Sequence, residues 1–324
     1  MYIHMELVQS FLLSVTRVRL SLYEQRIITK IVEHGQSVIQ GLSKLQYKYV
    51  TNPFDNEKIE IPIRYILTDG SKDYAKVLDA CKALMSRKFE FYNPKMKTYY
   101  ADTVIHNVMH VTGSGKVSFM VSRVLYDVMF NFELGYKNYD LEKALMLPTP
   151  YAVRMYVLLN NQTKPITWDI DKLKEMFGVA DKYTQTRDFI KKVIEPARVA
   201  LVNNTCNGFT YSRCYEGRKV VSLRFFPVKV TEADGQQYED FSRENIVNYK
   251  AVRMMLMQDC GFTGKEVLAN SSTVQAFSKL PQAVELLLSI EQRAKRKRMD
   301  KGYIVNAMKS EYKQMSEALK KFVG

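Results

Sequence analysis

Residues 170–197 read IDKLKEMFGVADKYTQTRDFIKKVIEPA. Apolar side chains recur at helical spacing over a first short segment that ends at Gly178. They recur again over a longer segment that begins near Thr184 and continues to Asn203. This spacing predicts two amphipathic helices, and glycine is a common residue at the end of a helix. A short helix followed by a turn and a longer helix is the pattern of a helix-turn-helix.

The segments on either side of this motif extend it to a winged helix. An earlier helix is predicted to start from a cap at Thr149, and two alternating segments, 209–215 and 220–228, flank a turn at 216–219. Alternation on both sides of a short turn predicts a two-stranded hairpin, which would be the wing. The side chains expected to face the core of this module are Ala152, Met155, Tyr156, Leu159, Ile170, Leu173, Phe177, Phe189, Val193, Ala197, Ala200 and Leu201.

The first half of the chain repeats the same order of elements. We expect a helix over about 19–34 that ends near Gly35, a short helix over about 61–68 and a longer helix over about 74–89. Alternating segments then flank turns at 93–94 and 112–116, as in a hairpin or a three-stranded meander. Two such patterns in tandem predict a helix-rich α+β fold with two winged-helix domains.

Two closely spaced prolines, Pro148 and Pro150, mark the predicted domain boundary, because proline interrupts a continuous helix. The predicted domains are an N-terminal winged helix over 1–147, a second winged helix over 148–230 and a helical C-terminal extension over 231–324. Within the extension we expect helices at about 239–259, 273–297 and 300–322.

The charge of the chain points to a polyanionic partner. The 324 residues carry 48 Lys and Arg against 34 Asp and Glu, a net charge of +14. Half of this excess lies in residues 149–230, which hold 14 basic and 7 acidic side chains. Such a concentration favours nucleic-acid phosphates, whose released counterions supply affinity for any sequence. The run RAKRKR at 293–298 is open to two interpretations, a solvated helix end or an auxiliary phosphate contact.

The third helix of a winged helix enters the major groove of double-stranded DNA, and the residues near its start meet base edges. Arg187 could donate two bonds to a guanine, whereas lysines are suited to phosphates. Pro196 lacks an amide hydrogen and is expected to bend this helix at Lys192. The candidate DNA-binding residues of the second module are Thr184, Gln185, Arg187, Asp188, Lys191, Lys192, Arg198, Arg213, Arg218 and Lys219.

The first module offers a sparser set of basic residues that is offset by acidic ones. We expect weaker backbone contacts or a protein interface there. The candidates are Lys72, Lys76, Lys82, Lys95, Lys97 and Lys116.

No catalytic or metal-binding motif is present in the sequence, so we expect no enzyme, no cofactor and no metal site. His106 and His110 fall on a predicted strand, where their side chains would stand ~13 Å apart. The turn 112–116 lacks the first glycine and the final Ser or Thr of a phosphate loop. The four cysteines lack zinc-ligand spacing and are expected to be reduced thiols.

The location of the protein follows from what the sequence lacks. No apolar stretch approaches the ~20 residues that a bilayer requires, and the start of the chain has no secretion signal. We therefore expect a cytoplasmic protein without a membrane partner.

Five segments in and around the second module carry a recognisable motif: YAVRMYVLL at 151–159, DKLKEMFGV at 171–179, DKY at 181–183, DFIKKVIEPA at 188–197 and RFF at 224–226. With these segments the sequence resembles the iteron-binding replication initiators (Rep proteins) of theta-replicating plasmids. That family has a similar "LYELL … L+ELLG … +Y … DFKK+VL+PA … IN" pattern ahead of an aromatic-rich wing strand. Segments 36–60 and 231–290 depart from the family pattern.

The resemblance implies a function that composition and spacing alone do not give. It implies that the second module reads direct repeats, or iterons, at a plasmid or phage origin, and that a monomer helps to open the duplex. It implies recruitment of host replication proteins, with the host helicase, initiator and chaperone as candidate partners. It also implies a homodimer, in equilibrium with the monomer and formed largely through the first module, that represses the protein's own promoter.

Two other functions remain open from the residues alone. A transcriptional regulator could use the same pair of winged helices without any role at an origin. A nicking initiator or relaxase would need a tyrosine beside metal-binding histidines, and the chain has 21 tyrosines but only four histidines.

Overall fold

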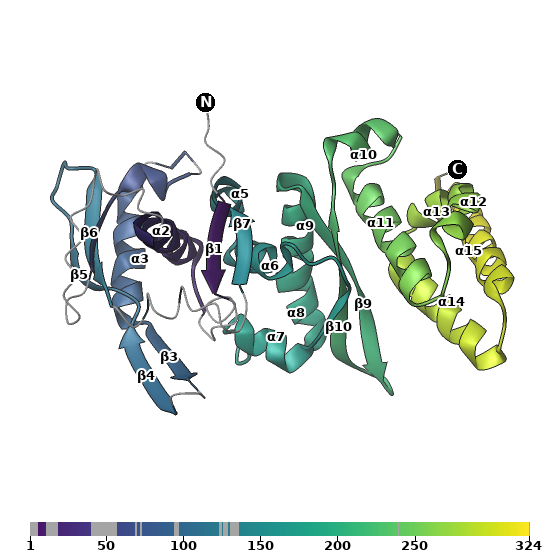
Figure 1. Ribbon diagram of the computed structural model, residues 1–324, viewed down its shortest axis with the longest axis horizontal. Coiled ribbons are helices and arrows are strands. Elements are labelled where there is room, and N and C mark those ends of the chain that lie inside the picture. The colour runs from purple at the N-terminus through teal and green to yellow at the C-terminus, as the bar shows by residue number, and fades with distance from the viewer. Residues whose placement is uncertain are drawn as a thin grey trace. The chain divides into compact units, whose positions relative to one another are not determined.

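The computed structural model divides into two compact units, and each is considered by itself (Figure 1). Two of the three unit boundaries fall inside the helices of the second helix-turn-helix, and the third falls in the loop after residue 161. The first unit comprises Met1–Asn161 with Lys174–Ala197, and the second comprises Gln162–Leu173 with Arg198–Gly324. The structure describes residues 6–10, 19–39, 57–68, 70–71, 73–93, 97–122, 125, 129, 136–238 and 240–323.

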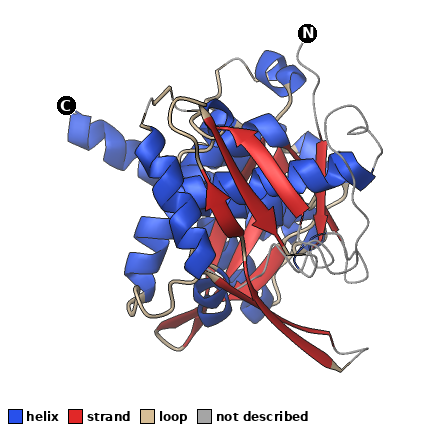
Figure 2. Ribbon diagram, turned by 90° about the vertical axis from the view of Figure 1, so that its left-hand side faces the viewer, coloured by secondary structure: helices blue, strands red, loops and turns tan. Residues whose placement is uncertain are grey.

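Strands in the described chain form small antiparallel groups of two or three that lie among helices (Figure 2). In the first unit β1 pairs with β7, β3 pairs with β4, and a three-stranded sheet has the order β2-β6-β5. The elements before the second module are β1 (Glu6–Ser10), α2 (Leu22–Ile39), β2 (Glu57–Pro62), the 3-10 turn η2 (Ile63–Tyr65), α3 (Tyr74–Ser86), β3 (Lys88–Asn93), β4 (Thr98–Thr103), β5 (His106–Met109), β6 (Lys116–Val121), β7 (Tyr136–Asp140) and α5 (Leu141–Met146).

The predicted elements of the first half are present, with three differences. Helix α2 continues through Gly35, which is buried within the helix and does not end it. Only the one-turn η2 occupies the predicted short helix, because Ile61 and Pro62 pair with β6 as the end of β2. Helix α3 ends at Ser86, so Phe89 belongs to β3 and not to the helix.

The first two helices of the second winged helix match their sequence signals. Helix α6 (Pro150–Leu159) begins at the predicted cap, where the Thr149 hydroxyl accepts a hydrogen bond from the Ala152 amide at 3.0 Å. Helix α7 (Ile170–Met176) is followed by Gly178 at φ 63°, a backbone conformation that glycine adopts without strain. Local signals therefore set the start of α6 and the end of α7.

The predicted long third helix is present, but part of it is wider than an α-helix. It consists of α8 (Thr186–Phe189), a π-helical segment η3 (Ile190–Ile194) and α9 (Glu195–Asn204). The Glu195 amide donates to the Ile190 carbonyl, five residues back. Pro196 cannot donate to the Lys192 carbonyl, so proline removes the α-helical bond at the place where the wider turn occurs. The irregularity predicted at this proline is thus a π turn.

The second unit contains the wing and the C-terminal helices. Strands β9 and β10 form the predicted hairpin, and β8, which the sequence did not suggest, adds a third strand in the order β8-β10-β9. The strands and C-terminal helices of this unit are β8 (Ile166–Asp169), β9 (Asn207–Glu216), β10 (Lys219–Lys229), α10 (Glu232–Gln237), α11 (Arg243–Gln258), α12 (Gly264–Ala269), α13 (Ser271–Ser278), α14 (Ala283–Lys297) and α15 (Lys301–Val323).

The extension is helical as predicted, but its helices are shorter and more numerous. The helix expected at 239–259 begins only at Arg243, where the Ser242 hydroxyl accepts the Asn245 amide at 3.2 Å. The helix expected at 273–297 is split into α13 and α14 around Pro281, because proline cannot continue a helix.

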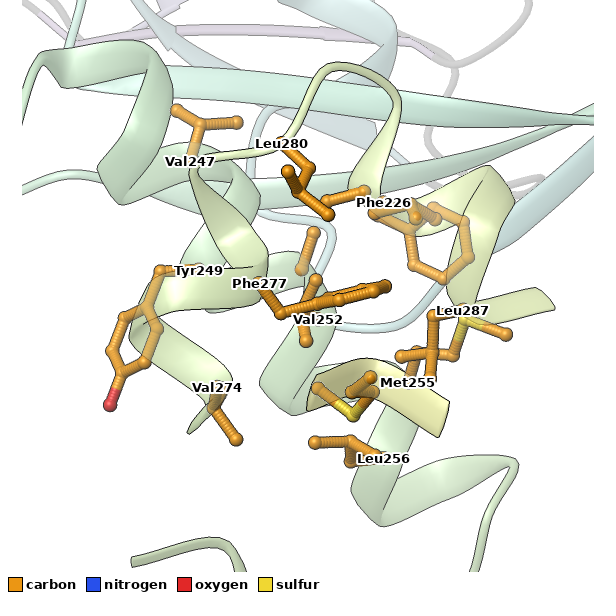
Figure 3. Packing of buried hydrophobic residues seen from close by; sticks show 14 of the residues in the cluster. Phe226, Val247, Tyr249, Val252, Met255, Leu256, Val274, Phe277, Leu280 and Leu287 are labelled. Carbon is orange, nitrogen blue, oxygen red and sulfur yellow. The ribbon is translucent and has the colours of Figure 1, made fainter. Parts of the chain in front are cut away.

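The C-terminal helices share one hydrophobic core with the wing sheet. Phe226 and Val228 of β10 are buried together with side chains of α11, α13 and α14 (Figure 3). Phe277 and Leu287 are fully buried within this cluster. The extension is therefore part of the fold of this unit and not an appended tail.

None of the helices in the described part of the chain is both long enough and apolar enough to cross a bilayer.

Candidate nucleic-acid interface

In the first unit, aromatic packing fixes the start of the third helix. Phe189 is fully buried, with its ring centroid 6.3 Å from that of Phe177 and 6.4 Å from that of Tyr183. The buried Lys174 donates to the Thr184 carbonyl at 3.3 Å, which ties the residues before the helix to α7. The inner face of this segment is thus locked by packing.

The outer face of the same segment carries most of the predicted DNA-binding residues. Arg187, Lys191 and Lys192 are exposed, and no acidic partner of their side chains is found among the described residues. Thr184 and Gln185 are exposed just before the helix, and Asp188 is half-buried within its first turn. We call Arg187, Lys191 and Lys192 the cationic face.

The π segment contributes to how this face is presented. Lys191 and Lys192 lie within η3, between the buried residues Ile190 and Val193. A π turn contains more residues per turn than an α-helix, so it turns the side chains that precede it relative to those that follow. Such turns occur frequently at functional sites.

In the second unit, the wing presents two exposed cations at its turn. Arg218 and Lys219 are exposed, and Gly217 between the strands has φ 60°, which favours glycine. Arg213, further back along β9, is half-buried. Its amide donates to Glu285 Oε1 at 3.2 Å, and its Nε lies 3.6 Å from the same oxygen.

Arg198, which was expected to extend the cationic face, is held in a different way. Its Nη1 donates to Glu244 Oε1 of α11 at 2.9 Å, and its side chain is 15% exposed. The sequence reasoning missed both acidic partners, Glu244 and Glu285. They lie 46 and 72 residues from the arginines that they contact, so no local signal could have indicated them.

Three of the four described candidates of the first module are paired with acids. Lys97 is exposed at φ 51° in the loop before β4. Lys72 and Lys95 lie outside the described residues. The ion pairs are Lys76 with Asp73 at 3.3 Å, Lys82 with Asp79 at 3.5 Å and Lys116 with Glu60 at 2.8 Å.

The two histidines considered as metal ligands have separate partners. His106 lies in β5, as predicted for a strand, and its Nδ1 is 3.0 Å from the Thr103 hydroxyl. His110 Nδ1 is 2.7 Å from the Lys116 carbonyl oxygen. The described residues contain no group of three or more His, Cys, Asp or Glu side chains that could hold a metal ion. All four cysteines are free thiols.

The order of helices and hairpins in both halves defines a tandem winged-helix DNA-binding protein of the α+β class. Comparison with protein families gives the same result. The model of the initiator replication protein WH1 domain matches residues 6–160, and the model of the initiator Rep protein WH2 domain matches residues 169–226. The chain therefore belongs to the initiator Rep protein family, and the resemblance seen in its sequence is confirmed.

A solved structure supports the fold. The crystal structure of the Pi initiator protein in complex with iteron DNA matches with a TM-score of 0.53 and 18% sequence identity. The match covers 72% of this chain and 100% of that chain. No curated protein sequence matches the chain.

Proposed function

We propose that this initiator binds direct repeats at a plasmid or phage origin, and that the second winged helix reads them. The observation that carries the proposal is the cationic face, because Arg187, Lys191 and Lys192 are exposed on a helix whose opposite side is locked by Phe189. Rigid placement of the helix suits base reading, which requires side chains at fixed positions in the groove. The Pi initiator, whose fold is similar, was solved in complex with iteron DNA.

Within the cationic face the residues have different roles. Arg187 donates a pair of hydrogen bonds to a guanine, and Lys191 and Lys192 contact phosphates. Thr184, Gln185 and Asp188 add polar contacts at the start of the helix. In the wing, Arg218 and Lys219 contact the backbone or the minor groove.

Arg198 and Arg213 have a more indirect role in this proposal. Each is engaged by a glutamate of the C-terminal helices. Glu244 and Glu285 offset the charge of the two arginines, so the arginines add less positive potential than the cationic face and serve mainly to join the wing unit to α11 and α14.

The first module acts mainly in assembly. Three of its four described candidate lysines are paired with acids, so they support weaker backbone contacts than those of the second module. We assign to it the dimer that represses the protein's own promoter, whereas the monomer opens the origin in the bacterial cytoplasm. The host helicase, the host initiator and a chaperone are the proposed protein partners.

A mobility-shift and footprinting experiment with the full chain on DNA flanking its gene tests this function. We expect protection of several direct repeats of ~20 bp, two turns of duplex, in the same register. Protection of a single inverted repeat alone would identify a transcriptional regulator instead. A covalent protein–DNA adduct would identify a nicking enzyme and would equally overturn the proposal.

A further inference from the structure

The C-terminal extension, residues 231–324, lies beyond the segments that the two family models match. Helix α14 of this extension is anchored directly to the wing. Glu285 in its first turn accepts the Arg213 amide of β9, while Leu287 and Ile290 are fully buried in the core shared with the sheet. The direction of α14 relative to the wing is therefore fixed by packing within one unit.

Seven cations of the extension are engaged by other groups of the protein. Three that are not engaged in this way adjoin one another at the end of α14, and we call them the basic triad: Arg296, Lys297 and Arg298. The engaged cations are Arg243 with the Thr205 carbonyl, Lys250 with Asp234, Arg253 over the Tyr249 ring, Lys279 over the Phe241 ring, Arg293 with Glu311, Lys295 with Glu291 and Lys301 with Glu266.

The basic triad is exposed, and within the described residues no carboxylate pairs with it. Arg296 makes only a long hydrogen bond of 3.4 Å to the Gln292 carbonyl of its own helix. The nearest carboxylate in sequence, Asp300, accepts the Tyr303 amide at 3.0 Å. Three adjacent positive charges thus remain available to an external anion.

The backbone at the triad is also unusual. Arg298 follows the last residue of α14 at φ 51° and ψ 41°, a left-handed conformation in which glycine or asparagine is the common residue. The Met299 amide, next to Arg298, donates a hydrogen bond to the Ala294 carbonyl at 2.9 Å and so caps the C-terminus of α14. A long basic side chain therefore occupies a position where glycine would be less strained.

The fold limits the distance between the triad and the wing turn. Along β9 at ~3.3 Å per residue, Gly217 is ~13 Å from Arg213. Along α14 at ~1.5 Å per residue, Lys297 is ~18 Å from Glu285. Since Arg213 and Glu285 are in contact, the wing turn and the triad are at most roughly 40 Å apart, close to the ~34–36 Å of one duplex turn. Figure 1 shows the free end of the β9–β10 hairpin and the turn after α14 at the lower edge of this unit.

We propose that the basic triad is a second phosphate-contacting surface, which binds the backbone of the duplex that the wing contacts, within about one turn of the wing contact. The inference rests on the proposed DNA-binding function and adds a contact surface outside both winged helices. Phosphate contacts carry no sequence information, so the triad adds affinity and salt dependence without changing which sequence is preferred.

The competing explanation is that the triad only complements the helix dipole. Cations near a helix C-terminus are stabilising without any ligand. The two explanations differ in their effect on DNA binding, and this difference can be measured.

The test is the dependence of DNA affinity on salt for the full chain carrying Arg296→Gln, Lys297→Gln and Arg298→Gln. We expect weaker binding and a log–log salt slope reduced by about 2–3, since each phosphate contact contributes ~0.9. The ratio of affinities for the cognate repeat and a random duplex should stay the same. An unchanged slope would overturn the proposal.

A control variant that removes charges elsewhere separates a local contact from net charge. Lys164→Gln and Lys229→Gln remove two exposed cations at the end of the wing sheet opposite the wing turn, since Ile166, two residues after Lys164, pairs with Phe225 and Lys229 ends β10. We expect the slope of this variant to match wild type. An equal drop per charge removed in both variants would reduce the effect to net charge and overturn the proposal.

Arg298→Gly tests whether misfolding causes the loss of DNA affinity. Glycine suits the left-handed position, so this variant should be at least as stable as wild type. We expect this variant to lose about one unit of salt slope while its thermal unfolding is unchanged or shifted upward. An unchanged slope in this stable variant would remove Arg298 from the proposed surface. Measurements on random duplex test the triad independently of the proposed function. If wild type showed no preference for repeats, the proposed function would fail, but the phosphate contacts of the triad would still appear in the salt slope on random duplex.

Discussion

Gly208 of β9 lies so close to Val247 of α11 that a Cβ on the glycine would be 2.6 Å from the Val247 Cγ2. Real Cβ atoms do not approach another carbon so closely, so strand and helix meet here because residue 208 has no side chain. The contact belongs to the core that joins the wing sheet to the C-terminal extension.

Gly208→Ala should therefore destabilise the protein by about 1–3 kcal/mol, the usual cost of overpacking a core. Urea unfolding measures the change. Gly235→Ala is the matched control, because nothing lies within 4 Å of its added Cβ and its φ is not positive, so we expect a neutral or slightly stabilising effect. The double variant with Val247→Ala should recover part of the loss; equal stabilities of the two glycine variants would contradict the close packing.

Removal of residues 231–324 should leave a fragment that does not fold as the intact protein does. Phe226 and Val228 of the wing sheet are buried in the cluster that these residues complete, so truncation exposes a contiguous apolar surface. We expect aggregation in sedimentation experiments and loss of cooperative unfolding. A soluble 1–230 fragment with a native-like transition would show that the second winged helix is independent of the extension.

Arg187→Ala should lower specific DNA binding by about 1–3 kcal/mol if the guanidinium reads a guanine. Arg187→Lys keeps the charge but loses the planar fork, so it should also lose specificity while retaining more of the non-specific affinity. Titration of cognate and random duplexes at one salt concentration measures both effects. Wild-type discrimination in the alanine variant would refute base reading by this residue.

Lys191→Gln and Lys192→Gln should each weaken binding to every sequence and lower the log–log salt slope by roughly 1, as expected for phosphate contacts. The affinity ratio between cognate and random duplex should stay near its wild-type value. A variant whose slope equals that of wild type does not lose a phosphate contact, and its lysine would then have to be reassigned.

Glu266 gives a prediction about acid stability. Two hydrogen bonds from Lys301 Nζ, at 3.0 and 2.8 Å, and bonds from the Thr263 amide and hydroxyl lower the pKa of Glu266 from 4.5 to about 2. Because its pKa is lower in the folded state, its contribution to stability is present above pH ~4.5 and is lost as the pH falls towards 2.

The difference in unfolding free energy between wild type and Glu266→Gln should accordingly be largest above pH ~5 and shrink towards pH 2. Urea unfolding over this pH range measures it, and Lys301→Gln should weaken the same pH dependence. A difference that stays constant across the range would mean that Glu266 ionises alike in both states.

Much of the fold could be predicted from local sequence. The Thr149 cap, the turn at Gly178 and the wing hairpin depend on residues within a few positions of one another, and each occurs where it was expected. The wrong predictions also have local causes. Gly35 was taken as a helix end, yet it is buried inside α2, where packing outweighs its low helix propensity.

The candidate site could be predicted only in part. The cationic face lies on one side of one helix, so helical spacing was enough to identify Arg187 and Lys191 as exposed. The state of Arg198 and Arg213 depends on Glu244 and Glu285, and these pairs form only when α11 and α14 pack on the wing unit.

The sequence by itself determined the two winged-helix patterns, because periodicity and capping act over one or two turns of chain, and its motif residues indicated the family by resemblance. Only the tertiary structure decided that the extension shares the core of the wing sheet, that β8 joins this sheet, and which arginines are held by acids. Those features depend on contacts between residues tens of positions apart, and such contacts arise from the packing of preformed elements and not from their individual propensities.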